Sequence, residues 1–212
     1  MIRIDHACFQ TLTGGAQVIE ADAHGDKVLL LPDGNYLKLF RRKRLLSSAL
    51  WSPYAQRFAD NCRVLAAHHI PCPEVIALYR IASIARDAVH YRPLPGQTLR
   101  RLLRQGIDEA EAAHLRRQLG GFVARLHAIG IYFRSLHLGN IVRTPQGMLG
   151  LIDLADIRVH RRGLGRFRRQ RNLKHLLRYP EEARWLAIQG DFSAAYREDA
   201  ALAGRGGAAT SP

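Results

Sequence analysis

The chain has 212 residues, of which 47% are apolar and 24% are charged, a composition typical of globular proteins. Its 32 lysine and arginine residues outnumber its 18 aspartate and glutamate residues, and the resulting formal net charge of +14 favours anionic partners. No run of about 18 apolar residues occurs and residues 1–6 lack an apolar signal core, which argues against a membrane span and against secretion and favours a cytoplasmic protein.

The N-terminal part of the chain predicts an antiparallel meander. Apolar runs at 18–21, 28–31 and 36–40 are separated by His-Gly-Asp and Pro-Asp-Gly, and such turns between β-prone runs are strong hairpin signals. A helix is expected over residues 52–70, because a Pro occupies its first turn and apolar residues then recur at helical spacing. The pattern therefore predicts three strands followed by one helix.

The middle of the chain predicts the rest of the sheet and then a change to helices. Residues 75–79 and 88–91 form a further strand pair, which brings the expected sheet to five antiparallel strands. Pro-Leu-Pro-Gly at 93–96 continues neither a strand nor a helix and marks a boundary between two lobes. Helices are expected at 98–104 and 108–128, the second with an apolar face and a glycine at its C-terminal end.

A polar motif follows the long helix. Residues 133–140 read Phe-Arg-Ser-Leu-His-Leu-Gly-Asn, and Asp153 stands thirteen residues after Asn140. This spacing is that of a phosphotransferase catalytic loop and its metal-binding Asp. In that pattern an Asp stands five residues before the Asn and accepts the proton of the attacking hydroxyl, whereas this chain has Ser135 there. The motif indicates either a kinase or a pseudokinase.

In this motif and in the order of its elements, the chain resembles the bacterial lipopolysaccharide core kinase family of the protein-kinase-like superfamily. Members of that family phosphorylate heptose or Kdo sugars, and the family includes short proteins named for toluene tolerance. The resemblance covers roughly residues 15 to 180 and is carried by Leu-His-Ala-Ile-Gly at 126–130, by Leu-His-Leu-Gly-Asn at 136–140, and by Asp153.

The resemblance implies an α+β protein-kinase-like fold with two lobes. The smaller lobe holds the five-stranded antiparallel sheet, and the larger is mainly helical and truncated. A single domain is expected over residues 1–200, and its parts are an N-lobe at about 15–92, a hinge at about 93–97 and a C-lobe at about 98–200. Residues 201–212, rich in Gly and Ala, are expected to form a disordered tail.

The cofactors implied by the resemblance are ATP and Mg²⁺. Lys38 stands inside an apolar strand, where a charge needs a partner, and the third-strand Lys of kinases binds the nucleotide phosphates and an acid on the next helix. Asp60 is the only carboxylate in that helix and is the expected partner, with Asn61 as a neutral substitute. The alternatives are a Lys38 on a solvated face and an Asp60 on the helix surface.

Asn140 and Asp153 are the oxygen ligands expected for Mg²⁺, which favours one or two protein side chains together with phosphates and waters. Their alternative roles are a turn cap for Asn140 and an ion pair with a neighbouring Arg for Asp153. Asp156 is the next acid and can assist the metal or act as a base. No Gly-rich loop joins the first two strands, so few backbone N–H groups can cradle phosphates.

The proton-transfer step is the weakest part of the pattern. Ser135 cannot accept a proton at neutral pH as a carboxylate does, and loss of a general base typically costs about 10²- to 10⁴-fold in rate. Phosphoryl transfer depends mainly on positioning and on charge neutralisation, so assistance by His137, Arg134 or Asp156 permits residual activity. A purely structural hydrogen bond is the alternative role of His137.

The expected partner is an anionic lipopolysaccharide core or its precursor, because the basic residues concentrate near residues 161–178. A cytoplasmic protein of this kind can lie at the periphery of the inner membrane. Solvated faces are the alternative explanation of the charge. A pseudokinase that acts as a regulatory or binding module at the cell envelope is the alternative function. Nucleic acid is disfavoured, because no nucleic-acid-binding signature accompanies the basic residues.

Overall fold

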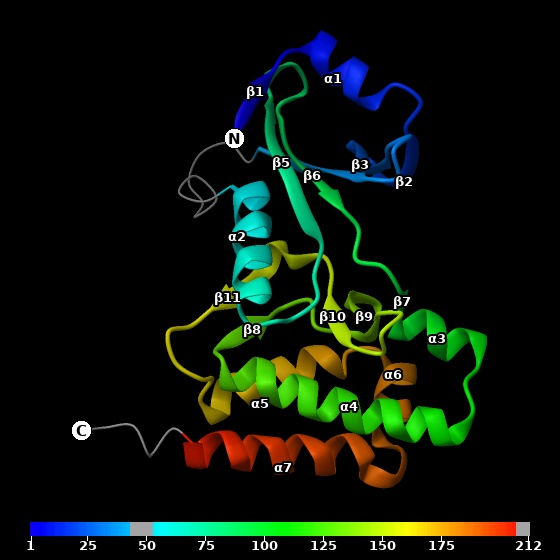
Figure 1. Ribbon diagram of the computed structural model, residues 1–212, viewed down its shortest axis with the longest axis vertical. Helices are drawn as coiled ribbons and strands as arrows, with labels where there is room; N and C mark the ends of the chain where they lie inside the picture. The colour runs from blue at the N-terminus through cyan, green and yellow to red at the C-terminus, as the bar shows by residue number, and fades with distance from the viewer. Residues whose placement is uncertain (43–52, 207–212) are drawn as a thin grey trace. The chain divides into compact units, whose positions relative to one another are not determined.

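A computed structural model describes residues 1–42 and 53–206 of the chain. The fold is mixed α+β and divides into two compact units (Figure 1). Unit 1 comprises Met1–Leu94 and Ile152–Asp156, and unit 2 comprises Pro95–Leu151 and Ile157–Pro212. The short segment that carries Asp153 therefore belongs with the N-terminal sheet, although the whole stretch Pro95–Leu151 precedes it in the chain.

Unit 1 contains a sheet of six strands among the described residues. The strands are β1 (Ile2–Ile4), β2 (Gln17–Asp22), β3 (Gly25–Leu30), β4 (Tyr36–Arg41), β5 (Glu74–Ile81) and β6 (Arg86–Arg92). Their order is β1-β5-β6-β4-β3-β2, and every neighbouring pair is antiparallel except β1 with β5. The sequence predicted five antiparallel strands and missed β1. Three residues show too little alternation to predict a strand.

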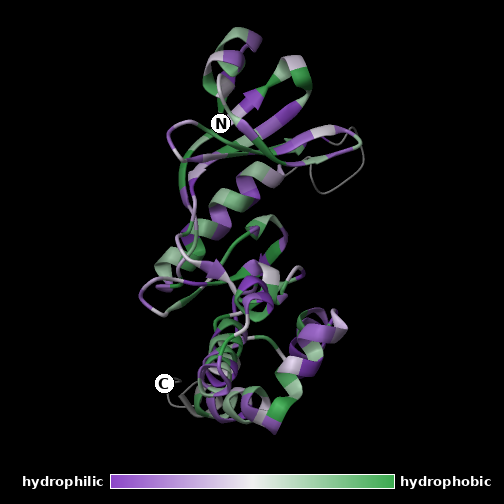
Figure 2. Ribbon diagram, turned by 90° about the vertical axis from the view of Figure 1, so that its right-hand side faces the viewer, coloured by the Kyte–Doolittle hydropathy of each residue, from purple (hydrophilic) through white to green (hydrophobic). Residues whose placement is uncertain are grey.

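Residues along β4 alternate between buried and partly buried, which gives the sheet two different faces. Figure 2 shows that the strands of unit 1 carry both hydrophobic and hydrophilic residues. Leu37 and Leu39 point into an apolar core, and Phe9 and Leu12 of α1 (His6–Thr13) pack against that core. The core cluster consists of Leu29, Leu31, Leu37, Leu39, Ile81 and Ala88. Lys38, which lies between the two leucines, points to the opposite face, because successive side chains of a strand alternate.

Helix α2 (Tyr54–Ala67) packs on the face that carries Lys38. The ring of Phe58 lies 5.3 Å from the ring of Tyr91, and Tyr91 also stacks on Tyr36 of β4 at 5.8 Å. The buried residues of the helix are Ala55, Phe58, Ala59, Asn61, Cys62 and Leu65. The expected start of this helix at residue 52 lies outside the described residues.

Unit 2 is mainly helical. Its helices are α3 (Leu99–Gln105), α4 (Glu109–Ala128), α5 (Arg166–Leu176), α6 (Pro180–Ala187) and α7 (Asp191–Gly206). Its strands are β7 (Gln97–Thr98), β8 (Ile131–Phe133), β9 (Ile141–Arg143), β10 (Leu149–Leu151) and β11 (Ile157–Val159). β7, β9 and β10 form a small antiparallel sheet, and β8 pairs with β11. Helices α3 and α4 match the helices expected at 98–104 and 108–128.

Helix α7 packs along α4, as Figure 1 shows. The two helices approach closely at Gly120, where an added Cβ would lie 2.4 Å from the carbonyl oxygen of Phe192. Helix α7 ends at Gly206, within the stretch 201–212 that the sequence predicts to be a disordered tail, and residues 207–212 lie outside the described residues. None of the helices in the described ranges combines the length and the apolar character that crossing a bilayer requires.

Gly130 forms the turn between α4 and β8. Its φ is +82°, and an added Cβ would lie 2.4 Å from the carbonyl oxygen of His160 and 2.7 Å from that of Arg162. We expect Gly130→Ala to lower the free energy of unfolding by roughly 3 kcal/mol, because left-handed strain and overpacking each cost about 1–2 kcal/mol. Chemical denaturation with a spectroscopic probe measures this loss.

Gly147→Ala is the matched control, since Gly147 has a φ of +78° and open space around an added Cβ. It carries the conformational cost alone and should lower the free energy of unfolding by about 1 kcal/mol. Equal losses for the two variants would contradict the tight packing of Gly130 against residues 160–162.

Candidate active site

Lys38 and Asp153 form the central ion pair of unit 1. Lys38 pairs with Val28 and Val89 in the sheet, and its side chain is only 16% exposed. Its Nζ atom donates to Oδ1 of Asp153 at 2.5 Å, whereas the Asp153 side chain is 47% exposed. The two residues stand 115 positions apart in the chain. The fold thus brings together two residues that the sequence had assigned to neighbouring parts of one nucleotide site.

Asp153 adopts a left-handed backbone conformation with a φ of +56°. Such a conformation costs a non-glycine residue about 1–3 kcal/mol, so the surrounding structure must hold it in place. The next residue is anchored by α2, because Asn61 is buried and its Nδ2 donates to the carbonyl oxygen of Leu154 at 2.7 Å. This contact holds the backbone that directly follows Asp153.

Asp60 does not pair with Lys38 among the described residues, which corrects the expectation from the sequence. Its carboxylate accepts from Nε2 of Gln56 at 2.9 Å and forms an ion pair with Arg63, on an exposed part of α2. The partner of Lys38 is Asp153 instead. The neutral alternative, Asn61, faces the interior, but its amide donates to the carbonyl oxygen of Leu154. Asn61 follows Phe58 by three residues and precedes Leu65 by four, and this helical spacing indicated that it lies on the buried side of α2.

The surroundings of the ion pair are aromatic on one side. Tyr36 and Tyr91 lie on the same face of the sheet as Lys38. Burial raises the pKa of the Tyr91 hydroxyl well above its ordinary value, and the negative charge of Asp153 adds to this rise. Tyr91 therefore stays neutral throughout the physiological range. It contributes an apolar ring and a hydroxyl to the site rather than a charge.

The turn between β2 and β3 is short. Only Ala23 and His24 separate the two strands, and the carboxylate of Asp22 accepts from the backbone N–H of His24 at 2.8 Å. That N–H group is thereby used within the turn. Few further backbone donors remain to surround a phosphate, as the sequence indicated.

The catalytic-type loop lies in unit 2, between β8 and β9. The side-chain Nδ2 of Asn140 donates to the backbone carbonyl oxygen of Ser135 at 2.9 Å, across the turn formed by the residues between them. Nδ1 of His137 accepts from the backbone N–H of Gly139 at 3.1 Å. Because the amide nitrogen of Asn140 is used inside the loop, its Oδ1 atom is the one that can coordinate a cation.

Arg134 and Ser135 sit where the loop begins. The Arg134 side chain is exposed, and its backbone carbonyl oxygen accepts from the guanidinium of Arg178 at 3.5 Å. Ser135 is half-buried. The loop therefore has the expected local shape, with a serine hydroxyl in place of a carboxylate, and the catalytic roles of Arg134, Ser135 and His137 stay predictions.

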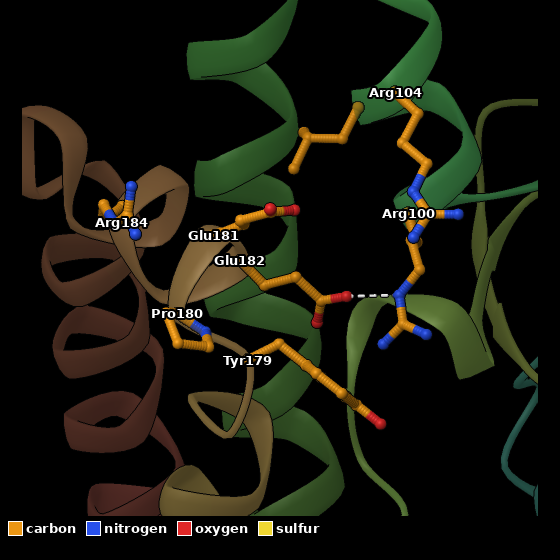
Figure 3. Close-up of a pocket in the computed structure, with 8 residues that line it drawn as sticks. Arg100, Arg104, Tyr179, Pro180, Glu181, Glu182 and Arg184 are labelled. Carbon is orange, nitrogen blue, oxygen red and sulfur yellow. Dashed lines mark hydrogen bonds and ion pairs between the residues drawn. The ribbon is translucent and has the colours of Figure 1, made fainter.

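A pocket of about 610 Å³ lies beside this loop within unit 2 (Figure 3). Its lining residues are Arg100, Leu103, Arg104, Tyr179, Pro180, Glu181, Glu182 and Arg184. Arg100 and the buried Glu182 form an ion pair at 2.5 Å, and the Arg100 guanidinium lies 4.4 Å from the centre of the Tyr179 ring. The second oxygen of Glu182 accepts from the backbone N–H of Leu138 at 3.0 Å.

Arg100 also joins this pocket to the loop, since its guanidinium lies 3.3 Å from Nδ1 of His137. The Tyr179 ring meets the His137 ring edge-on at 5.4 Å. Sequence reasoning missed these pocket residues. Arg100 and Glu182 are 82 positions apart, and neither belongs to a motif that would have connected them.

Each of the two residues expected to bind Mg²⁺ carries a suitable oxygen atom. Carboxylate and amide oxygens are its preferred protein ligands, and one or two of them are sufficient when phosphates complete the coordination. Asp153 in unit 1 offers a half-exposed carboxylate, and Asn140 in unit 2 offers an amide oxygen. Within the described ranges, no three His, Cys, Asp or Glu side chains gather in a way that could hold a metal ion.

Comparison with known proteins identifies the family. A family model described as "Phosphotransferase enzyme family" matches residues 15–136, which is more than half of the chain. The match includes the whole Lys38 strand and ends within the catalytic-type loop. No curated protein matches the chain in sequence.

His127 supports the catalytic-type loop from its buried side. Its Nδ1 atom lies 2.8 Å from the Tyr196 hydroxyl, and its Nε2 atom lies 3.2 Å from Oδ1 of Asn172. The Asn172 amide in turn donates to the carbonyl oxygen of Phe133 at 2.6 Å and accepts from its N–H at 3.3 Å. Since Oδ1 of Asn172 can only accept, the neutral His127 carries its proton on Nε2.

Burial lowers the pKa of His127 from 6.5 to about 4, against the opposing effect of the Asn172 hydrogen bond. The unfolded chain therefore binds one more proton between these pH values, and stability falls as the pH falls through this window. We expect this residue to remove about 2 kcal/mol of the free energy of unfolding between pH 7 and pH 5. Urea denaturation at the two pH values measures the change.

His127→Gln is the control for this titration. Its free energy of unfolding should be lower at pH 7, because a buried network is disturbed, but should depend less on pH than that of the parent chain. An unchanged pH dependence in the variant would show that other groups cause the acid sensitivity.

Proposed function

Because the chain belongs to the phosphotransferase enzyme family, within the protein-kinase-like superfamily, we propose that it transfers a phosphoryl group from ATP to a sugar hydroxyl of a lipopolysaccharide core or its precursor. The observation that carries this proposal is the Lys38–Asp153 pair, which the fold assembles across 115 residues. A strand lysine and a strained, half-exposed aspartate are the pair that nucleotide phosphates and a metal require.

Each residue has a role in this proposal. Lys38 would bind the nucleotide phosphates. Asp153 of unit 1 and Oδ1 of Asn140 of unit 2 would each offer an oxygen ligand to magnesium. When bound, ATP would supply the phosphoryl group and Mg²⁺ would offset the negative charge of the phosphates. His137 and Arg134 would contact the acceptor from the loop, and Ser135 would hydrogen-bond to its hydroxyl. As the O–P bond forms and the bond to ADP breaks, the hydroxyl proton would pass to solvent water, because Ser135 is not a base. The loss of a base lowers the rate but leaves positioning and electrostatic stabilisation in place.

The acceptor side of the proposal rests on charge. The pocket beside the loop carries three arginines and two glutamates, and one arginine and one glutamate neutralise each other. Among the described residues, Arg104 and Arg184 have no carboxylate within ion-pair distance. Guanidinium groups bind phosphates and carboxylates in bidentate fashion, and these are the anionic groups of a core sugar. This pocket is therefore the proposed acceptor site.

The second candidate function is that of a pseudokinase, a regulatory or binding module at the cell envelope. Two observations favour it. Ser135 occupies the position of the general base, and the turn between β2 and β3 offers few donors to a phosphate. A module of this kind keeps the loop and the basic surface but needs no turnover. In either function the protein works in the cytoplasm, at the periphery of the inner membrane.

Calorimetric titration of ATP with Mg²⁺ tests the nucleotide site. We expect binding by the parent chain and none by Lys38→Ala or Asp153→Ala, because each variant removes one charge of the pair and leaves the other without its partner. Absence of binding by the parent chain at millimolar nucleotide would make the pseudokinase the better function.

Asp60→Ala is the matched control for that titration. It removes an exposed carboxylate that pairs only with Gln56 and Arg63 among the described residues, so nucleotide affinity should not change. If Asp60→Ala weakened binding as strongly as Asp153→Ala, the assignment of the phosphate site to the Lys38–Asp153 pair would be wrong.

Ser135→Asp tests the loop itself. A carboxylate at this position would accept the acceptor's proton, so phosphate transfer to purified core sugars should rise by about 10²-fold or more. Radiolabelled ATP provides the readout, and Ser193→Asp on the exposed surface of α7 adds the same charge as a control. No gain, with nucleotide binding intact, would contradict the alignment of Ser135 with the catalytic base or would show that another group already serves.

A further inference from the structure

The most basic part of the chain is residues 157–179, here called the basic segment. It contains nine arginine and lysine residues and no aspartate or glutamate. Those nine charges exceed half of the net charge of +14 of the whole chain. Acid-free runs also occur at 34–59 and 112–152, but these carry only six and five cations. The basic segment is therefore distinguished by the number of its cations, which calls for an explanation beyond solubility.

The charges of the basic segment point into solvent. Eight of its nine cations are exposed: Arg158, Arg161, Arg162, Arg166, Arg168, Arg171, Lys174 and Arg178. None of these eight has a carboxylate within ion-pair distance in the part of the chain that the structure describes. The ninth, Arg169, is partly buried and donates to the carbonyl oxygen of Leu164 at 2.6 Å. The surface therefore offers unneutralised charge to a partner.

Helix α5 adds an apolar group to this charge. Asn172 and Leu176 are its buried residues, and the opposite side of the helix carries Phe167, which is 75% exposed. Arg171 and Lys174 follow Phe167 at four and seven residues, so all three lie on one side of the helix. An aromatic ring is thus held in the middle of a basic surface.

We propose that the basic segment docks unit 2 onto an anionic lipid bilayer, with the cations on the headgroup phosphates and the ring of Phe167 inserted at the boundary with the acyl chains. Each Lys or Arg near an anionic membrane surface strengthens binding by about fivefold. An amphipathic helix with a basic polar face and a phenylalanine is the arrangement that lies in such an interface. A single-stranded nucleic acid fits less well, because it needs several aromatic rings on which bases stack.

The basic segment is tied directly to the catalytic-type loop. Asn172 of α5 makes two hydrogen bonds with the backbone of Phe133, and His175 lies 3.0 Å from the Tyr132 hydroxyl. Arg178 donates to the backbone of Arg134. A helix docked on a membrane would therefore carry the loop with it. This step rests on the proposed function, in which the acceptor is a membrane-embedded sugar.

Vesicle flotation with the full chain tests the docking surface. Vesicles of phosphatidylcholine alone are compared with vesicles that also contain phosphatidylglycerol, at low and at high salt. We expect binding only to the anionic vesicles, weakened by salt, and a loss of about 100-fold in the triple variant Arg166→Gln, Arg171→Gln, Lys174→Gln, because three fivefold contributions multiply. Phe167→Ser should weaken binding while leaving its salt dependence unchanged.

The matched control removes three exposed arginines outside the basic segment, in the triple variant Arg3→Gln, Arg101→Gln, Arg197→Gln. It has the same net charge as the first triple variant and should keep most of the vesicle binding. Thermal unfolding of both variants shows whether each is folded. Equal losses in two folded variants would overturn the proposal, since net charge rather than this surface would then govern binding.

Two further outcomes separate the alternatives. Tighter binding to single-stranded RNA than to anionic vesicles, lost in the first triple variant, would assign the basic segment to nucleic acid and would overturn the lipid proposal. Asp153→Ala should keep vesicle binding even when it loses nucleotide binding. Docking and nucleotide chemistry can therefore fail independently of one another.

Discussion

The ion pair between Lys38 and Asp153 is the interaction on which the proposed chemistry depends. Lys38 stands between two buried leucines of β4 and is largely covered, so its charge requires a nearby anion. Asp153 supplies that anion from a left-handed conformation that α2 stabilises through Asn61 and Leu154. Phosphates and a metal would compete for the same two groups. A nucleotide would thus have to break the Lys38–Asp153 ion pair in order to bind.

A second constraint explains why the loop keeps its shape with a serine at position 135. The loop is held through backbone atoms: Asn140 contacts the carbonyl oxygen of Ser135, and Asn172 contacts the backbone of Phe133. His127 supports Asn172 from the buried side. None of these contacts uses the side chain at position 135. These backbone contacts hold the loop whatever the rate of proton transfer.

The sequence predicted those parts of the molecule that short-range patterns encode. Alternation and turn residues located the strands of the meander, and motif spacing located Asn140 and Asp153. Asp60 was chosen because a carboxylate on α2 was expected to serve Lys38, but the anion came from a distant segment that only the fold brings near. The Arg100–Glu182 pair was missed for the same reason, since no local pattern connects residues 82 positions apart.

Docking to a membrane would change what a slow chemical step means for this protein. Confinement of enzyme and acceptor to one surface converts their encounter into an effectively intramolecular event, with local concentrations that reach about the millimolar range for short tethers. If the proposed activity holds, a loop without a strong base would turn over slowly, but a long residence beside its acceptor would offset part of that loss. The serine at position 135 and the basic segment would then have complementary effects. The serine would lower the rate of phosphate transfer, and the basic segment would lengthen the time that the protein spends beside its acceptor.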